Sequence, residues 1–177
     1  MKATSRFGDL VPIPNCTIEI AGETIPMYIL PEISDSKSAT YTDTAIMGRA
    51  TPVKTYSQSE NRTITMELHF IALRKEHILR NIQWLRLIQS AVYPRDDGGQ
   101  APYLPPPICK ITCGELLSAD GLCCVLKSYS VRFPPDQVWD ETTLLPYKFD
   151  VSTTWDAVYA SSDLPGQEMI AGDFNSQ

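Results

Sequence analysis

The chain has 177 residues, of which 43% are hydrophobic and 20% are charged, as is usual for one soluble globular domain with a sizeable core. It has no run of about 18 apolar residues and no apolar signal-peptide core at its start, so we expect no membrane insertion and folding in a cytoplasm. The net charge is −6, and residues 115–177 hold 10 acidic but only 3 basic groups, which argues against stable nucleic-acid binding.

The first third of the chain predicts an arm, a hairpin and a long loop. Residues 1–15 are expected to form an irregular N-terminal arm. Residues 17–30 predict a hairpin that turns at residues 21–23, and Pro26 places this hairpin near a sheet edge. Residues 31–52 show no clear period, so we expect a long loop that binds a partner; a floppy surface insertion is the alternative.

The centre of the chain predicts a strand followed by a helix. Residues 62–71 alternate strictly, and residues 53–57 with a turn at 58–61 are expected to complete a hairpin with them. From Lys75 the period changes to that of a helix over 75–92, with Arg80 away from its apolar stripe. The residues expected to face the core are Ile64, Met66, Leu68 and Phe70 in the strand, and Ile78, Ile82, Leu85, Ile88 and Val92 in the helix.

The last part predicts three more strands after a stiff, proline-rich connection over residues 93–107. These strands are expected at 108–113, 122–133 and 145–155. One face of the second carries Val125, Tyr129, Val131 and Phe133, and one face of the third carries Leu145, Tyr147, Phe149, Val151, Thr153 and Trp155.

The predicted fold class is therefore mainly β with one long helix (α+β), an antiparallel sandwich or open barrel with the helix packed against it. The β domain covers residues 16–159, and residues 160–177 form a polar C-terminal tail.

No catalytic motif is found, and we predict no catalytic, cofactor-binding or metal-binding residues. The two histidines, His69 and His77, lack carboxylate or thiol partners at a useful spacing, so both are expected to be polar surface or interface residues. The acidic pairs at 96–97 and 140–141 lie in turns and are expected to be solvated, although a hydrolase using two carboxylates stays open.

The five cysteines are expected to be small buried thiols. In a strand Cys109 and Cys113 share a face, whereas Cys123 and Cys124 point to opposite faces. A metal site from Cys109, Cys113 and Cys123, or a redox pair, are the alternatives.

The order of these elements resembles a known family, the amino-terminal domain of tube–baseplate adaptor proteins in contractile phage tails and related injection systems. There, a Gly-Arg-x-x-Pro-x-x-x-Tyr segment precedes a strand that ends in Glu-Leu-x-Phe, followed by a helix and a Tyr-Pro step. The matching parts of this chain are Gly48–Tyr56, Arg62–Phe70, Tyr93-Pro94, Pro106–Gly114 and the two long strands at 122–133 and 145–155.

The resemblance implies a tail-tube-like fold and a structural role in the virion, after assembly in the host cytoplasm. The chain would form a ring of copies of itself, six being expected, at the baseplate, where it would join tail tube, hub and wedge while DNA passes through. We expect no room for the LysM domain that many relatives carry, no cofactor and no enzymatic activity.

The sequence also allows other functions. A tube-initiator or tail-terminator ring protein of the same fold is the nearest alternative. A small-molecule-binding β-barrel and an enzyme using a cysteine are two further classes.

Overall fold

The computed structural model describes residues 10–94, 104–117 and 121–159, and within them the chain is mainly β with two helices. The sheets are antiparallel and not closed into a barrel, which confirms the predicted class in this coarse form. The strands are β1 (Cys16–Ile20), β2 (Glu23–Pro26), β3 (Glu32–Ser36), β4 (Ala39–Thr44), β5 (Val53–Ser59), β6 (Thr63–Ile71), β7 (Cys109–Cys113), β8 (Leu122–Arg132) and β9 (Lys148–Ala157); the helices are α1 (Lys75–Ser90) and α2 (Gly114–Leu117).

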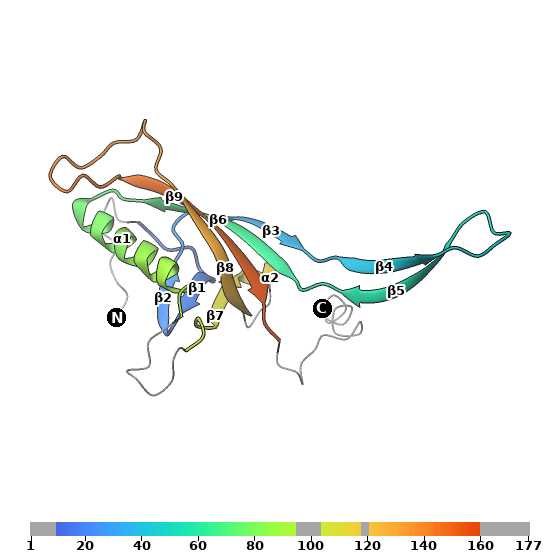
Figure 1. Cartoon of the computed structure of the whole chain (residues 1–177). Coiled ribbons are helices and arrows are strands. Elements are labelled where there is room, and N and C mark those ends of the chain that lie inside the picture. The colour runs from blue at the N-terminus through green and yellow to red at the C-terminus, as the bar shows by residue number, and fades with distance from the viewer. Residues whose placement is uncertain (1–9, 95–103, 118–120, 160–177) are drawn as a thin grey trace.

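Seven strands form the main sheet, in the order β2-β1-β7-β8-β9-β6-β3. β1 and β2 form the predicted hairpin, and β2, which contains Pro26, is an edge strand as expected. Figure 1 shows α1 lying alongside this sheet. The core between them is one continuous cluster, and its largest fully buried side chains include Trp155, Phe149, Ile18, Ile64 and Leu68.

The alternation of β6 is as predicted, and that of β9 is as predicted from Phe149 onward, whereas Leu145 and Tyr147 lie before the strand and are half-buried. Ile64, Met66, Leu68 and Phe70 are all buried, and the same face of β9 buries Phe149, Val151, Thr153 and Trp155. The two strands pair over their full length, with Phe70 opposite Phe149 and their rings stacked at 5.0 Å. This pairing joins two strands that contribute many of the fully buried core side chains.

Helix α1 covers the core with the predicted stripe. Ile78, Leu85 and Ile88 are buried, and Asn81 is buried among them. The Asn81 side chain tolerates this position because its Nδ2 donates a hydrogen bond to the carbonyl of Ile71 at the end of β6. Arg80 differs from the prediction, since its guanidinium lies 4.8 Å from the centre of the Trp84 ring and 5.0 Å from that of Tyr28. The Nε atom of Arg80 is buried and has no hydrogen-bond partner among the described residues. The attraction of the guanidinium to these two ring faces offsets part of the free-energy cost of that burial.

The predicted long loop over 31–52 is wrong. It contains β3, which pairs with β6, and β4, which pairs with β5. The predicted hairpin between 53–57 and 62–71 is wrong for the same reason, because both strands pair with earlier ones. Neither β3 nor β4 buries an apolar face, so hydrophobic periodicity could not reveal them.

A register shift changes the predicted face of β8. The buried residues are Leu122, Cys124 and Leu126, and the ladder to β9 shifts between Leu126 and Ser128. Val125 therefore points away from the core, although the sequence placed it on one face with Tyr129. One extra residue in a strand exchanges the two faces beyond it, and no sequence period can show this.

Several predicted segments lie outside the described residues. These are the C-terminal tail at 160–177, most of the N-terminal segment at 1–15 and most of the connection at 93–107, including the acidic pair at 96–97. Among the described helices, none combines the length and apolar character required to cross a membrane.

Candidate interaction surface

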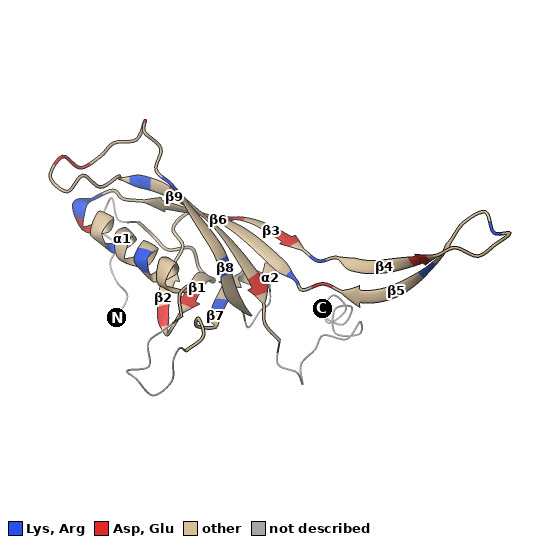
Figure 2. Ribbon diagram, in the orientation of Figure 1, with Lys and Arg blue, Asp and Glu red and all other residues tan. Residues whose placement is uncertain are grey.

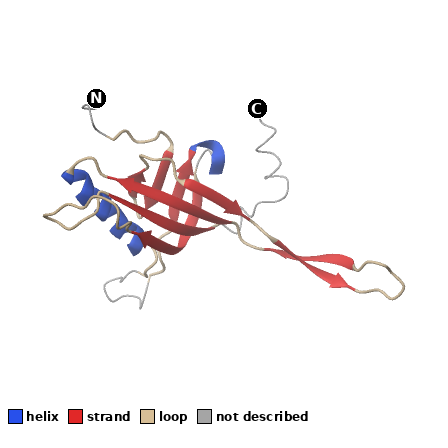
Figure 3. Ribbon diagram, turned by 90° about the horizontal axis from the view of Figure 1, so that it is seen from above, coloured by secondary structure: helices blue, strands red, loops and turns tan. Residues whose placement is uncertain are grey.

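The most conspicuous surface is a two-stranded ribbon, β4–β5 with its connecting turn, which we call the arm (residues 39–59). Figures 1 and 3 show it projecting away from the main sheet. Every residue of β4 is exposed, and in β5 only Val53 is half-buried. Among the described residues, the arm therefore places no strand residue in the buried core.

Within the arm, the antiparallel ladder between β4 and β5 is supported by cross-strand side-chain pairs and by no buried core. The rings of Tyr41 and Tyr56 meet edge to face at 5.8 Å, and the hydroxyls of Thr42 and Ser57 are 2.7 Å apart. Such exposed pairs contribute about 0.2–1 kcal/mol each, and an isolated hairpin is marginal in water. The arm is thus poorly stabilised by this chain alone.

The base of the arm is held more firmly. Arg62 Nε donates to both carboxylate oxygens of Asp35, at 2.9 and 3.0 Å, and this bond raises the pKa of the arginine. The Glu60 amide donates to the carbonyl of Ser38 at 2.9 Å. A firm base with a weak ribbon beyond it sets the direction of the arm without immobilising its end.

The tip of the arm is apolar. Met47 is 103% exposed and Ile46 is 48% exposed, at the end of a ribbon whose other side chains are mostly polar. Methionine adapts its shape to varied contacts. An exposed apolar tip on a polar ribbon is typical of a contact with another molecule.

One face of the main sheet is not covered by any other described element, and we call it the polar sheet face. It is formed by the outward residues of β3, β6, β9 and β8. Paired rows across these strands include Ser34, Thr65, Thr154 and Ser128, and then Glu32, Glu67, Ser152 and Ser130. Antiparallel sheets commonly keep one such face in water, so this face is compatible both with solvent and with a polar channel.

Charges are scattered over the described part of the chain. Figure 2 shows basic and acidic positions interspersed, with no continuous basic stripe along one element.

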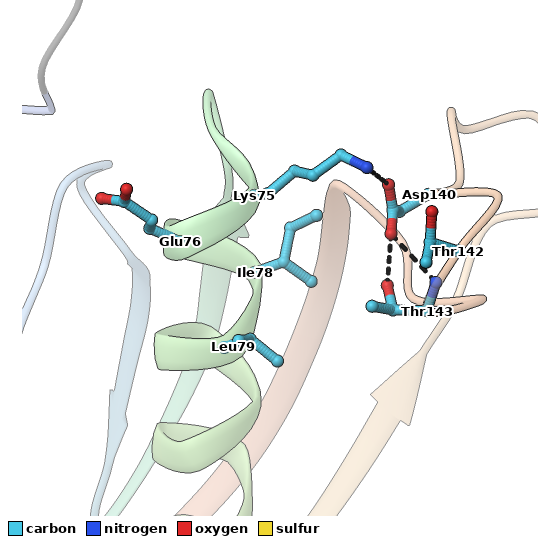
Figure 4. Close-up of a pocket in the computed structure, with 7 residues that line it drawn as sticks. All are labelled: Lys75, Glu76, Ile78, Leu79, Asp140, Thr142 and Thr143. Carbon is cyan, nitrogen blue, oxygen red and sulfur yellow. Dashed lines mark hydrogen bonds and ion pairs between the residues drawn. The ribbon is translucent and has the colours of Figure 1, made fainter.

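A shallow pocket of about 270 Å³ lies between the start of α1 and the loop before β9. Figure 4 shows Lys75 Nζ reaching Asp140 Oδ1, at 2.8 Å, while the amide and hydroxyl of Thr143 donate to Asp140 Oδ2 at 3.0 and 2.7 Å. The lysine bond, followed by the threonine bonds, lowers the pKa of Asp140 to about 2.

Asp140 was expected to be solvated, but it is only 4% exposed. Its polar bonds attach the loop to α1, and its acidity is opposite to what a general acid needs. We therefore assign it a structural role.

Four of the five cysteines are buried free thiols, as predicted, whereas the fifth, Cys123, is a free thiol that is exposed. The Sγ atoms of Cys16 and Cys113 are 3.6 Å apart, and burial, together with this contact, raises the pKa of Cys16 to about 12. Burial also raises the pKa of Cys124. Raised pKa values disfavour the reactive thiolate.

The alternative metal site from Cys109, Cys113 and Cys123 is not assembled. Cys109 and Cys113 are buried on the core face of β7, whereas Cys123 is exposed. Cys123 and Cys124 thus lie on opposite faces of β8, as the alternation predicted.

The histidines differ from each other. His77 Nδ1 lies 3.4 Å from the Leu73 amide at the start of α1. His69 has the carboxylate partner that sequence spacing failed to provide, because its Nδ1 lies 2.7 Å from Asp150 Oδ1, and Glu67 is close to both. The strand alternation places residues 67 and 69 on one polar face, but the pairing of that face with β9 could not be read from the sequence.

Comparison with models of known protein families gives no match for this chain, and a search of curated proteins finds no relative.

Proposed function

We propose that this chain is a structural component of a contractile phage tail, a ring-forming adaptor at the baseplate that joins tail tube, hub and wedge. The resemblance described from the sequence supplies the family. The observation that carries the proposal furthest is the arm, a ribbon that this chain builds without any core of its own.

The arm fits a role in assembly better than a role in an isolated molecule. Ordering its residues costs conformational entropy that its few side-chain pairs scarcely offset. A neighbour that receives the apolar tip and pairs with the ribbon would supply the missing stabilisation. In a closed ring the same contact repeats at every subunit, so a modest interface suffices.

The main sheet also has two ends at which strands can be added. β3 and β2 are its edge strands, and β3 has four exposed residues of five. Open strand edges pair readily with other chains. A subunit of a tube-like ring needs such edges, because each copy continues the sheet of the next.

The polar sheet face supports a lining role within this proposal. Its serine and threonine rows offer hydrogen bonds to water and no basic stripe to DNA. A channel lined in this way lets a polyanion pass without adhesion.

The direct test removes the arm. Ser38 and Glu60 face each other at its base, so replacing residues 39–59 by Asn-Gly closes the ribbon with a two-residue turn. We expect a folded body with a circular-dichroism spectrum of the native kind but loss of ring-sized species in native mass spectrometry, measured with and without tail proteins.

A milder variant separates contact from folding. Ile46→Ser combined with Met47→Ser should weaken assembly while the arm remains. Val138→Ser is the matched control, because Val138 is 72% exposed but lies in the loop between β8 and β9. Full assembly by the arm-deleted chain would overturn the proposal.

The two alternative functions have unequal support. A tube-initiator or tail-terminator ring protein would share all of these features, and its partners would distinguish it. A small-molecule-binding barrel has less support, since the described sheet is open and its core is filled by Trp155 and Phe149, at 0% and 1% exposure.

A further inference from the structure

Three metal-ligating side chains converge on the polar sheet face. Glu67 and His69 are two residues apart in β6, so they share its outward face, and Asp150 lies directly opposite His69 in β9. One carboxylate oxygen of each acid and one ring nitrogen of His69 all lie within 4.8 Å of one another. The pairing of β6 with β9 brings His69 and Asp150 together although they are 81 positions apart in the sequence.

The backbone that carries these donors is held firmly. They lie on two neighbouring interior strands of the main sheet, and the next residues along these strands, such as Leu68 and Val151, are fully buried on the core face. The side chains of His69 and Asp150 are 26% and 16% exposed, so an ion can reach them while water is partly excluded. Donors on packed strands are positioned better than donors on loops.

Acidic groups outnumber basic ones in the strand positions around this cluster. Glu32 of β3 lies directly opposite Glu67, and like charges in that position repel. Among the described residues, no lysine or arginine forms an ion pair with Glu67. One basic residue is also a direct neighbour, because Arg132 of β8 lies opposite Asp150 in the β8–β9 ladder.

A simple ion pair explains only part of this arrangement. The contact between His69 Nδ1 and Asp150 Oδ1, at 2.7 Å, would satisfy those two groups but leave the Glu67 carboxylate beside Glu32 without a counter-charge. A divalent ion held by all three donors accounts for every member of the cluster.

We propose that Glu67, His69 and Asp150 bind a divalent transition-metal ion of the zinc class. One imidazole nitrogen with two carboxylate oxygens suits Zn²⁺, Co²⁺ or Ni²⁺, whereas Mg²⁺ and Ca²⁺ favour oxygen donors alone. Three protein donors leave a coordination position for water or for a group from another molecule. This inference does not depend on the proposed function.

The geometry needs only a small adjustment. Donors about 2.1 Å from a tetrahedral ion lie roughly 3.4 Å apart. His69 Nδ1 and Asp150 Oδ1, now 2.7 Å apart, must therefore separate slightly. The donor atoms that are farther apart, up to 4.8 Å, must approach one another. Side-chain rotation of Glu67 and Asp150 supplies both movements. The ion takes the place of the proton between His69 Nδ1 and Asp150 Oδ1, and the neutral imidazole then carries its proton on Nε2.

Calorimetric titration of the full chain with Zn²⁺ alone tests the site, in a Cys123→Ser background because Cys123 is the exposed thiol. We expect one ion per chain. His69→Gln and Glu67→Gln should each weaken binding by at least about tenfold. Two matched controls should bind as before: His77→Gln, which removes the other histidine, and Asp156→Asn, in the same strand and on the same face as Asp150.

Absorption of the Co²⁺ complex identifies the donors. Nitrogen and oxygen ligation gives weak visible bands only, and these should vanish in His69→Gln, whose unfolding midpoint without metal verifies its fold. An intense near-ultraviolet thiolate band would overturn the assignment, as would absence of binding or Zn²⁺ affinity unchanged in both His69→Gln and Glu67→Gln.

Discussion

Single side chains at the centre of the main sheet show how this fold handles burial. Thr153 is fully buried, yet its hydroxyl donates to the carbonyl of Met66 at 3.1 Å and accepts from Trp155 Nε1 at 2.8 Å. One hydroxyl thereby satisfies two groups that would otherwise be costly inside an apolar core. Trp155 can be buried completely for that reason.

Phe149 should be among the most sensitive positions for stability. It is 1% exposed and stacks on Phe70, so Phe149→Ala should lower the free energy of unfolding by about 3–5 kcal/mol. Phe133→Ala is the matched control, since Phe133 is 43% exposed and should cost much less. Urea unfolding measures both, and equal small losses would contradict the assigned core face.

Asp140 should make stability depend on acid pH. Its pKa is about 2 in the folded chain against an ordinary 3.8, so its contribution is present above about pH 4 and is lost as the pH falls toward 2. The stability difference between the native chain and Asp140→Asn should therefore shrink between about pH 5 and pH 2. Urea midpoints across this range measure it, and a constant difference would exclude the mechanism.

At the scale of elements, the chain combines a packed sheet with a ribbon that lacks a core. β6 and β9 share a buried face, whereas β4 and β5 share none, although both pairs are antiparallel ladders. Strand pairing alone therefore does not imply equal stability, because buried apolar area supplies most of the free energy.

This difference is measurable by hydrogen exchange of the isolated chain. Amides of the β4–β5 ladder should exchange fast, through local opening, while those of the β6–β9 ladder should exchange only near global unfolding. Addition of an assembly partner should slow the arm amides selectively. Equal protection of both ladders in the isolated chain would show that the arm needs no neighbour.

At the scale of the whole molecule, the body and the arm have separate requirements. The core cluster is continuous from β1 to β9, so we expect the body to fold without a partner. The arm, the open strand edges and the polar sheet face all lie outside that core. Within the proposed ring, assembly would thus add contacts to a finished body and would order the arm.

The sequence by itself determined the elements that bury an apolar face. The alternation of β6 and β9 and the apolar stripe of α1 predict which of their residues face the core, because burial imposes a period of 2 on a strand and of 3.6 on a helix. The opposite exposure of Cys123 and Cys124 followed from the same rule.

Only the tertiary structure decided which strands pair. β3 and β4 bury no apolar face and so carry no periodic signal, and the shift in β8 moved Val125 off its predicted face. The cluster of Glu67, His69 and Asp150 depends on the register between β6 and β9, which joins residues 81 positions apart. Register is fixed by long-range packing, and local residue patterns do not contain it.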